Sequence, residues 1–371
     1  MNGGPKTEYS ANTRLAQPLV GQAERRAVDR VLSSGSLSQG PEVALFEEAF
    51  SELVGSRQCV AVNSGTSALL VSLLALGISA GDEVIVPSFT FAATANAVAL
   101  TGATPVFVDI DPETFCIDPV AVEAAIGNST AAVIPVHLYG HPADMGILGD
   151  IAARHGLAVV EDAAQAHGTL HPHGPVGSIG EAAAFSFYPT KNMTSGEGGM
   201  AVFADPAHAR RARLLRNQGM DRPYENEIVG YNLRMTDVHA AIGRVQLERL
   251  SEFNSTRRAN AARLTEVLGG SDVVAPVERP GCRHVYHQYT VRSTRRDELC
   301  RALADHGVES RVFYPTPVHR LGPFAARDGA GRRDLPETER ACNEVLSLPV
   351  GPHLDGVALD HLAGTLQEVI R

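Results

Sequence analysis

Lysine is almost absent from this sequence, and its scarcity restricts where lysine chemistry can occur. The chain has 371 residues with lysine only at Lys6 and Lys191, and the other 30 of its 32 basic residues are arginine. Lys6 lies in a polar N-terminal segment that we expect to lack fixed structure. Any reaction that needs a lysine amine in the body of the chain therefore depends on Lys191.

Membrane, secretory and nucleic-acid functions are disfavoured by further absences. The longest near-continuous apolar run, residues 67–78, is too short to cross a bilayer. Residues 1–14 are polar and lack the apolar core of a signal peptide. The formal net charge is -10 and no basic run stands out, so we expect no nucleic-acid polymer as a partner. These features predict a cytoplasmic protein that does not bind a membrane.

The cysteine and histidine patterns indicate neither a disulfide framework nor a metal site. The five cysteines are scattered and form no CxxC pair, which favours reduced thiols. His167, His171 and His173 lie close together in sequence, but no carboxylate or cysteine completes a ligand set. Pro172 and Gly174 around them are typical of a loop. We predict no bound metal ion.

The common phosphate-binding loops of nucleotide enzymes are also missing. Lys191 follows Tyr-Pro-Thr rather than the glycine of a GxxxxGK[ST] motif, and no GxGxxG motif opens a helix after the first expected strand. The glycine-rich stretch 196–199 leads into a strand rather than out of one. P-loop NTPases and Rossmann dehydrogenases are therefore disfavoured.

The sequence does contain a regular alternation of short β-rich runs with helical stretches. Several runs are unbroken and apolar, as in strands buried on both faces of a parallel sheet. The expected strands cover residues 59–63, 83–88, 104–109, 132–137, 157–161, 183–187 and 199–203. The helices expected between them cover residues 66–76, 92–100, 120–126 and 145–155. This order predicts the α/β class with a large, mostly parallel sheet of seven strands.

The C-terminal third has a different pattern and predicts a second, smaller domain. A long helix is expected from about Thr236, whose hydroxyl can cap it, and the composition shifts beyond Asn254. The expected elements after it are strands at 287–291 and 310–313 and helices at 337–345 and 359–370. We therefore predict a large domain over residues 1–250, with 1–14 as a flexible tail, and a small α/β domain over 251–371.

One candidate phosphate site lies where the first expected strand meets a helix. Residues 63–67, Asn-Ser-Gly-Thr-Ser, supply hydroxyls and the free N–H groups of a first helical turn. That arrangement can bind a phosphate at the positive end of the helix dipole. Ordinary helix capping is the alternative explanation.

A pair of carboxylates closes another expected strand. Glu161 and Asp162 follow residues 157–160, and ligands of an open parallel sheet lie beyond the carboxyl ends of its strands. A carboxylate there can pair with a cationic ring nitrogen, or it can simply cap a helix. Gln165 and His167 follow closely and can face the same crevice.

The segment 185–192, Phe-Ser-Phe-Tyr-Pro-Thr-Lys-Asn, is the most informative part of the sequence. A buried strand delivers Ser186, and the turn after it delivers Lys191. A lysine against an apolar wall loses its proton easily and becomes nucleophilic. A solvated surface lysine is the alternative, but lysine is avoided elsewhere in the body of the chain.

These motifs together resemble the DegT/DnrJ/StrS family of sugar aminotransferases, which depend on pyridoxal phosphate (PLP). The resemblance covers residues 15–370. It rests on Gly-Pro-Glu-Val at 40–43, Asn-Ser-Gly-Thr at 63–66, Pro-Ser-Phe-Thr-Phe at 87–91, Val-His-Leu-Tyr-Gly at 136–140, Glu-Asp-Ala-Ala-Gln-Ala-His at 161–167, the lysine segment, and Gly-Tyr-Asn-Leu-Arg-Met-Thr-Asp at 230–237. It implies the type I aminotransferase fold and a homodimer with shared active sites.

The resemblance also implies a role for each motif residue. Lys191 would hold PLP as a Schiff base and move protons, and Asp162 would keep the pyridinium nitrogen protonated. The other expected cofactor contacts are Gln165 near the phenolic oxygen, Phe91 on the ring face, Gly65, Thr66 and Ser186 at the phosphate, and Asn232 from the partner subunit. The expected substrate contacts are His167, Tyr314 and His319.

The implied reaction moves an amino group from L-glutamate to a keto-sugar nucleotide. The favoured acceptor is a dTDP-4-keto-6-deoxyhexose, and a C3 ketone is the alternative. Relatives that dehydrate sugars carry histidine at the lysine position, and Lys191 argues against that reaction. A catalytically silent PLP-binding regulator and another type I PLP enzyme, such as a lyase, remain alternatives.

Overall fold

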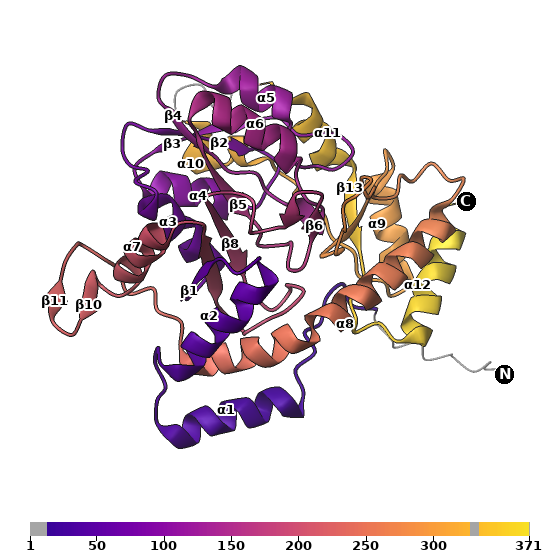
Figure 1. The fold of residues 1–371 in the computed structure, drawn as a ribbon. Coiled ribbons are helices and arrows are strands. Elements are labelled where there is room, and N and C mark those ends of the chain that lie inside the picture. Colours follow the sequence, from indigo (N-terminus) through magenta and orange to yellow (C-terminus); the bar gives the residue numbers. More distant parts are fainter. Residues whose placement is uncertain (1–12, 327–333, 371) are drawn as a thin grey trace, which may run out of the picture.

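A seven-stranded sheet forms the centre of the larger part of the molecule. The computed structural model describes residues 13–326 and 334–370. The strands are β1 (Gln58–Val62), β2 (Glu83–Pro87), β3 (Thr104–Val108), β4 (Thr130–Val133), β5 (Ala158–Asp162), β8 (Ala182–Ser186) and β9 (Gly199–Phe203). Their order is β1-β9-β8-β5-β4-β2-β3, and β9 alone runs antiparallel to its neighbours. The carboxyl ends of the other six strands therefore share one edge, as the predicted fold class requires (Figure 1).

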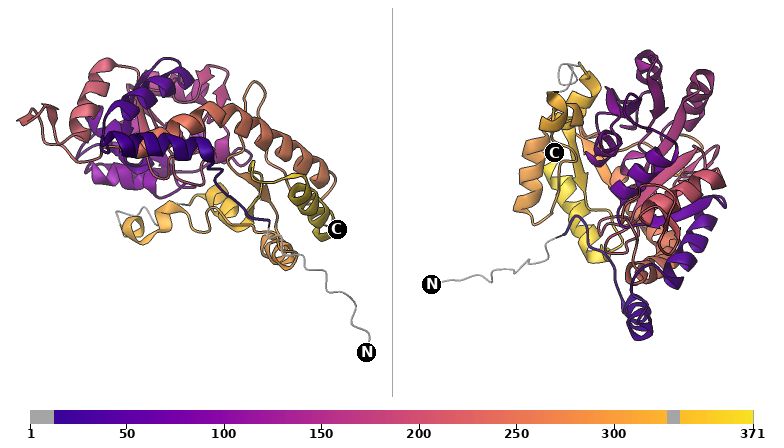
Figure 2. Two further views of the ribbon diagram at one scale, coloured as in Figure 1. Left: turned by 90° about the horizontal axis from the view of Figure 1, so that it is seen from below. Right: turned by 90° about the vertical axis from the view of Figure 1, so that its left-hand side faces the viewer.

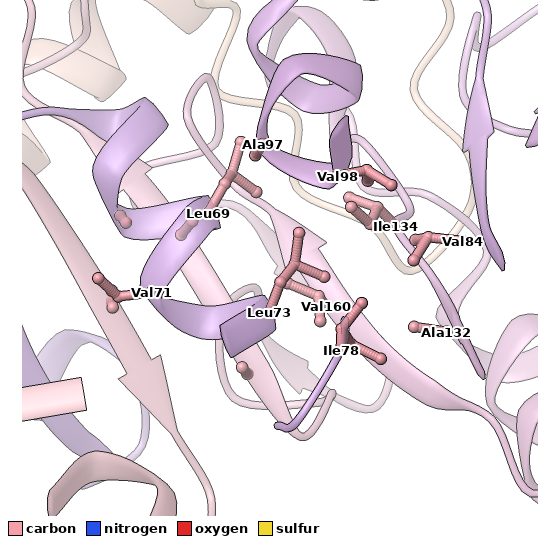
Figure 3. Close-up of a cluster of buried hydrophobic side chains, with 14 of the residues drawn as sticks. Leu69, Val71, Leu73, Ile78, Val84, Ala97, Val98, Ala132, Ile134 and Val160 are labelled. Carbon is pink, nitrogen blue, oxygen red and sulfur yellow. The ribbon is translucent and has the colours of Figure 1, made fainter. Parts of the chain in front are cut away.

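Helices cover both faces of this sheet, because alternate residues of each strand point to opposite sides. One face packs against α3 (Gly65–Ala75), α4 (Ala93–Leu100) and α7 (Pro206–Arg216). Figure 3 shows Leu69 of α3 near Ala97 of α4, and Leu73 of α3 near Val160 of β5. The other face packs against α2 (Pro41–Leu53), α5 (Pro119–Ala125), α6 (Met145–His155) and the first half of α8 (Asp237–Leu268). The apolar run at 67–78 is thus a buried helix, and the described residues contain no helix long and apolar enough to span a bilayer.

The C-terminal part has a hydrophobic cluster of its own. The second half of α8 packs there with α9 (Arg296–Asp305), α12 (Gly356–Val369) and the antiparallel pair β12 (Tyr289–Arg292) and β13 (Val345–Leu348). Figure 2 shows this part beside the larger one, with α8 crossing between them. The predicted boundary at residue 250 falls inside α8, and the division into two domains stays a prediction.

The remaining elements are short or lie at the periphery. Helix α1 (Gln22–Ser34) packs along α8, and the hairpin of β10 (Met220–Arg222) and β11 (Glu225–Asn226) projects away from the sheet (Figure 1). The others are β6 (Leu170–His171), β7 (Gly174–Pro175), η1 (Leu138–Gly140), η2 (Val318–Arg320), α10 (Gly322–Ala325) and α11 (Pro336–Glu344). Of the predicted tail, residues 1–12 lie outside the described residues, and the Thr13 N–H donates to the Gly307 carbonyl at 2.9 Å.

Three sequence predictions differ from the structure. Strand β4 ends at Val133 rather than at residue 137, because Pro135 has no N–H for the ladder and only Val136 forms a bridge, with Asp162. Residues 310–313 are not a strand: only Arg311 forms an isolated bridge, with Ser347. The strand that pairs with β12 is β13, which begins where a helix was expected to end.

Candidate active site

A cavity of about 390 Å³ lies at the carboxyl edge of the sheet, and most of the predicted site residues line it. Ser64, Gly65 and Thr66 follow β1, Asp162 ends β5, Ser186 ends β8, and Lys191 lies in the turn beyond β8. The opposite side is formed by residues of the C-terminal third, namely His287, Gln288, Arg311, Phe313 and Tyr314. Its volume is in the range of small-molecule sites. The fold therefore brings together residues that are far apart in sequence.

The first turn of α3 forms one end of the cavity. The Ser64 hydroxyl caps the helix by accepting the Ser67 N–H at 3.1 Å. Gly65 lies so close to Ser186 that an added Cβ would stand 2.7 Å from the Ser186 Cβ. Because Gly65 has no side chain, the start of α3 can lie directly against Ser186, so that its N–H groups and the Ser186 hydroxyl face the same part of the cavity. This hydroxyl-rich helix N-terminus suits the expected phosphate group.

Asp162 is the buried carboxylate of the cavity wall. Its Oδ2 accepts the Thr94 hydroxyl at 2.8 Å, and its Oδ1 accepts the Ala164 N–H at 3.2 Å. Burial raises the pKa of Asp162, while these hydrogen bonds and the Lys191 charge act in the opposite direction. A cation placed against this carboxylate would therefore be strongly favoured, as the predicted pairing with a pyridinium nitrogen requires.

Lys191 lies on the same wall, and its backbone N–H donates to the Tyr188 carbonyl at 2.9 Å in a tight turn. Burial lowers the pKa of the Lys191 amine to about 8, and the attraction of Asp162 opposes this only partly. Near neutral pH the unprotonated fraction of this amine is therefore much larger than that of an ordinary lysine. The unprotonated amine is the nucleophilic form, so this environment suits the covalent role of Lys191, which stays a prediction.

A buried hydrogen-bond network anchors the residue next to the lysine. The Asn192 side-chain NH2 donates to Asn254 Oδ1 at 2.8 Å and to the Val285 carbonyl at 3.1 Å. The Asn192 Oδ1 is thus left to accept from His287 Nδ1, 3.2 Å away. Burial lowers the pKa of His287 well below its usual value, so the imidazole is neutral. The network holds the turn of Lys191 to α8 and to the C-terminal segment at once.

Gln165 and Phe91, both predicted to contact the cofactor, line the cavity. Gln165 accepts the Tyr139 N–H at 2.7 Å and donates to the Tyr314 hydroxyl at 3.2 Å, which fixes its amide in the cavity. Phe91 lines the cavity with 60% of its surface exposed, although large aromatic side chains are usually buried. An exposed ring on a cavity wall suits a flat aromatic ligand.

Neighbouring Glu161 has a different environment from Asp162. Its carboxylate contacts His137 Nε2 at 3.1 Å and accepts the N–H groups of Gly177, Ile179 and Gly180 at 2.8–2.9 Å. Burial alone would raise the pKa of Glu161, but these contacts lower it below its usual value. Glu161 therefore holds the chain around β7 in place and does not line the cavity.

Three predicted site residues do not line the cavity of their own chain. His167 is buried against the rings of Phe185 and Phe187, and burial lowers its pKa to about 3. His319 is buried, with Nδ1 2.6 Å from the Ser88 hydroxyl. Neither histidine reaches the cavity, so the structure gives the predicted substrate contacts of His167 and His319 no support. Asn232 is exposed before α8, as a residue that serves a partner's site would be.

Several residues of the site and its support were not predicted from the sequence. Thr94 does not line the cavity itself but holds Asp162; it lies one helical turn beyond Phe91, and no motif singles it out. Tyr139 reaches the cavity from η1, and Arg311 from a segment that forms only an isolated bridge. In the described ranges, no group of three or more His, Cys, Asp or Glu residues is arranged to hold a metal ion.

Comparison with protein families agrees with this geometry. Residues 18–367 match the model of the DegT/DnrJ/EryC1/StrS aminotransferase family. One relative is the erythromycin biosynthesis sensory transduction protein EryC1 of Saccharopolyspora erythraea, 47% identical over 92% of this chain and 94% of its own. Another is the dTDP-3-amino-3,4,6-trideoxy-alpha-D-glucose transaminase of Streptomyces venezuelae, 46% identical over 89% of this chain and 87% of its own.

Solved structures of the same kind superpose closely on this chain. The structure of S. venezuelae DesV in complex with a ketimine intermediate has a TM-score of 0.90 at 43% identity and covers 94% of both chains. The PLP form of the sugar aminotransferase Spr1654 of Streptococcus pneumoniae also has a TM-score of 0.90, at 28% identity over 96% of this chain and 98% of its own. These matches confirm the predicted fold, the PLP cofactor and the aminotransferase class, and this chain belongs to the DegT/DnrJ/EryC1/StrS aminotransferase family.

Proposed function

We propose that this enzyme transfers an amino group from L-glutamate to a dTDP-linked keto-deoxyhexose whose ketone is at C3. The reaction class follows from the family and from Lys191 beside Asp162 in one cavity. The prediction from the sequence is a C4 ketone. The name of the S. venezuelae transaminase, a relative 46% identical, instead supports a C3 acceptor, and that similarity carries this choice.

Each residue of the cavity would have a separate role in such a reaction. Bound PLP would withdraw electrons from the carbon that carries the amino group. Lys191, with its lowered pKa of about 8, attaches the cofactor and afterwards carries a proton as a free amine. Asp162 holds the positive charge of the ring nitrogen, and Thr94 holds Asp162. Ser64, Gly65 and Ser186 form the end of the cavity that would bind the phosphate group of PLP.

A two-step experiment tests this proposal. The purified enzyme is first mixed with L-glutamate, and the absorbance of the bound cofactor is followed together with 2-oxoglutarate. It is then given dTDP-3-keto and dTDP-4-keto sugars in parallel, and the amine position in the product is determined by NMR and mass spectrometry. A 3-amino product is expected. A 4-amino product would show that the ketone of the acceptor is at C4, and a product without new nitrogen would indicate a lyase.

The same experiment separates an enzyme from a silent regulator. Relatives of this chain include a sensory transduction protein and a pleiotropic regulatory protein of Geobacillus stearothermophilus, the latter 42% identical over 93% of this chain and 94% of its own. A silent regulator would show the absorbance of bound PLP without any change on adding glutamate. The S. venezuelae relative, which is named as a transaminase and is 46% identical, favours turnover instead.

We further propose that two copies of the chain share their active sites. Asn232 is exposed and lies outside its own cavity, and the nearby hairpin projects into solvent (Figure 1). Tyr224 and Val229 on this projection are 95% and 91% exposed, which suits an apolar contact with a second copy. In such a dimer Asn232 would complete the phosphate end of the partner's site.

Subunit mixing tests the shared site. Asn232→Ala should weaken PLP retention, whereas the control Asn343→Ala, at another exposed asparagine on α11, should not. Mixed with Lys191→Ala subunits, Asn232→Ala subunits should regain roughly a quarter of wild-type activity, because about half of the dimers would be mixed and each would contain one intact site. No recovery after verified exchange, or an active monomer, would exclude a shared site.

A further inference from the structure

The charges of the cavity wall are few and unevenly placed. Among the described residues that line it, the formal cations are Lys191 and Arg311, and the formal anions are Asp162 and Glu197. Once Lys191 is attached to the cofactor, Arg311 supplies the permanent positive charge of this chain's described wall. Both proposed substrates are anions: glutamate has two carboxylates and the sugar nucleotide has a diphosphate. Because the formal net charge of the chain is -10, a local cation would favour the binding of either of them.

Arg311 has a fixed backbone and an available side chain. Its N–H donates to the Ser347 carbonyl at 3.1 Å, and its carbonyl accepts the Ser347 N–H at 2.8 Å. The side chain is 61% exposed and contacts the Glu309 carboxylate at 3.3 Å. Exposed ion pairs of this kind contribute little, so the guanidinium can exchange this partner for a substrate anion at small cost.

The anchoring of Glu309 favours such an exchange. The other carboxylate oxygen of Glu309 accepts the Leu15 N–H at 3.1 Å, so Glu309 has a second partner of its own. Arg311 also precedes Phe313 and Tyr314, and the Tyr314 hydroxyl accepts the Gln165 amide. Arg311 therefore lines the same cavity as Phe313, Tyr314 and Gln165.

We propose that Arg311 binds the anionic group of a substrate, either a carboxylate of the amino donor or the diphosphate of the sugar nucleotide. This inference rests on the proposed function. A guanidinium offers two parallel N–H donors, which match a carboxylate and a phosphate equally well. Arg311 is thereby a substrate-selecting residue, separate from the residues that hold the cofactor.

Direct binding measurements on the PLP-loaded enzyme distinguish the two anions. Thymidine diphosphate probes the nucleotide, and glutarate, a dicarboxylate without an amine, probes the donor; both are titrated by calorimetry. The glutamate half-reaction, followed by cofactor absorbance, is a second readout. Arg311→Ala should weaken one of the two probes roughly tenfold to a hundredfold, as expected for hydrogen bonds to charged groups. Arg311→Lys should recover part of the lost affinity, since lysine keeps the positive charge but lacks the two parallel N–H donors of a guanidinium.

Arg320→Ala is the matched control, because Arg320 is an arginine with a half-exposed side chain that pairs with Glu339 and lies outside the cavity. It should leave both affinities unchanged. Loss of thymidine diphosphate binding alone would assign Arg311 to the diphosphate, and loss of glutarate binding alone to the donor. Unchanged binding of both by Arg311→Ala, in an enzyme that turns over, would overturn this inference alone. A wild-type enzyme that binds neither probe and ignores glutamate would overturn the proposed function with it.

Discussion

The two sides of the cavity are built from different kinds of structure. The sheet side consists of residues at the ends of β1, β5 and β8 and at the start of α3, and it includes Asp162 and Lys191. The C-terminal side consists of His287, Gln288, Arg311, Phe313 and Tyr314, which lie between regular elements. Strand ends hold side chains rigidly, whereas irregular segments change more readily among relatives. We therefore expect the sheet side to perform the chemistry and the C-terminal side to select the substrate.

The largest effect should come from Lys191→Ala, which removes the amine on the sheet side. Lys191 is the one lysine in the sequence beyond Lys6, so no nearby lysine can replace it. Turnover and the absorbance of covalently attached PLP should both be lost. Borohydride reduction of the wild-type enzyme followed by peptide mapping checks the assignment. A label on Lys6, or multiple turnovers by the variant, would contradict it.

Asp162→Asn should have the next largest effect. An amide can still accept the Thr94 hydroxyl, but it cannot hold the positive charge of a ring nitrogen. We expect turnover to fall by more than about a hundredfold, or ~2.7 kcal/mol of barrier, while PLP content falls much less. The measurement is kcat against cofactor content, and near-normal turnover would refute the role.

Glu161→Gln is the control for that experiment, because it changes the adjacent carboxylate. Glu161 accepts three backbone N–H groups and contacts His137 outside the cavity. Its substitution should lower the melting temperature and leave the activity of the folded enzyme close to wild type. The two variants thus separate a site residue from a structural one at neighbouring positions.

The rate at which PLP attaches to the enzyme should depend on pH, because the attachment needs the neutral amine of Lys191 on the sheet side. Burial lowers the pKa of Lys191 to about 8, so the neutral amine makes up roughly half of the population at pH 8 and roughly 1% at pH 6. The rate at which apoenzyme attaches added PLP should therefore rise about fiftyfold between these values and level off above them. Stopped-flow absorbance measures it. A rate that keeps rising to pH 10 would show an ordinary, solvated lysine.

The sheet side could be predicted from the sequence, and the C-terminal side mostly could not. Asp162 and Ser186 end strands that apolar runs predict, and Lys191 lies in the turn five residues after Ser186, so the sequence indicates both the strands and the edge where they end. The two histidines predicted to face substrate show the limit of this reasoning. His167 follows Gln165 by two residues, yet the turn after β5 directs Gln165 into the cavity and His167 into the core. Sequence position alone does not fix which way a turn points its side chains.

Long-range pairing explains the other misses. Arg311 reaches the cavity because its backbone pairs with that of Ser347, and no local sequence pattern predicts this contact. Strand β13 is not predicted from the sequence: the expected helix at 337–345 includes only its first residue, and its strand partner, β12, lies more than fifty residues earlier. Local apolar runs were enough to predict the strands of the large sheet, whereas the C-terminal part depends on such distant pairs.

The smallest effect should come from Tyr314→Phe, on the C-terminal side. Its hydroxyl accepts the Gln165 amide at 3.2 Å, while its ring contacts Phe91 with a centroid separation of 6.1 Å. The variant keeps the ring and loses one hydrogen bond, which corresponds to roughly a twofold to tenfold change. Because the sheet side is untouched, the loss should appear in the KM for the keto-sugar and not in PLP retention. Tyr188→Phe, which removes a hydroxyl from the sheet side of the same cavity, should leave that KM unchanged. If Tyr314→Phe instead released PLP, the C-terminal side would hold the cofactor as well, and the division of labour between the two sides would fail.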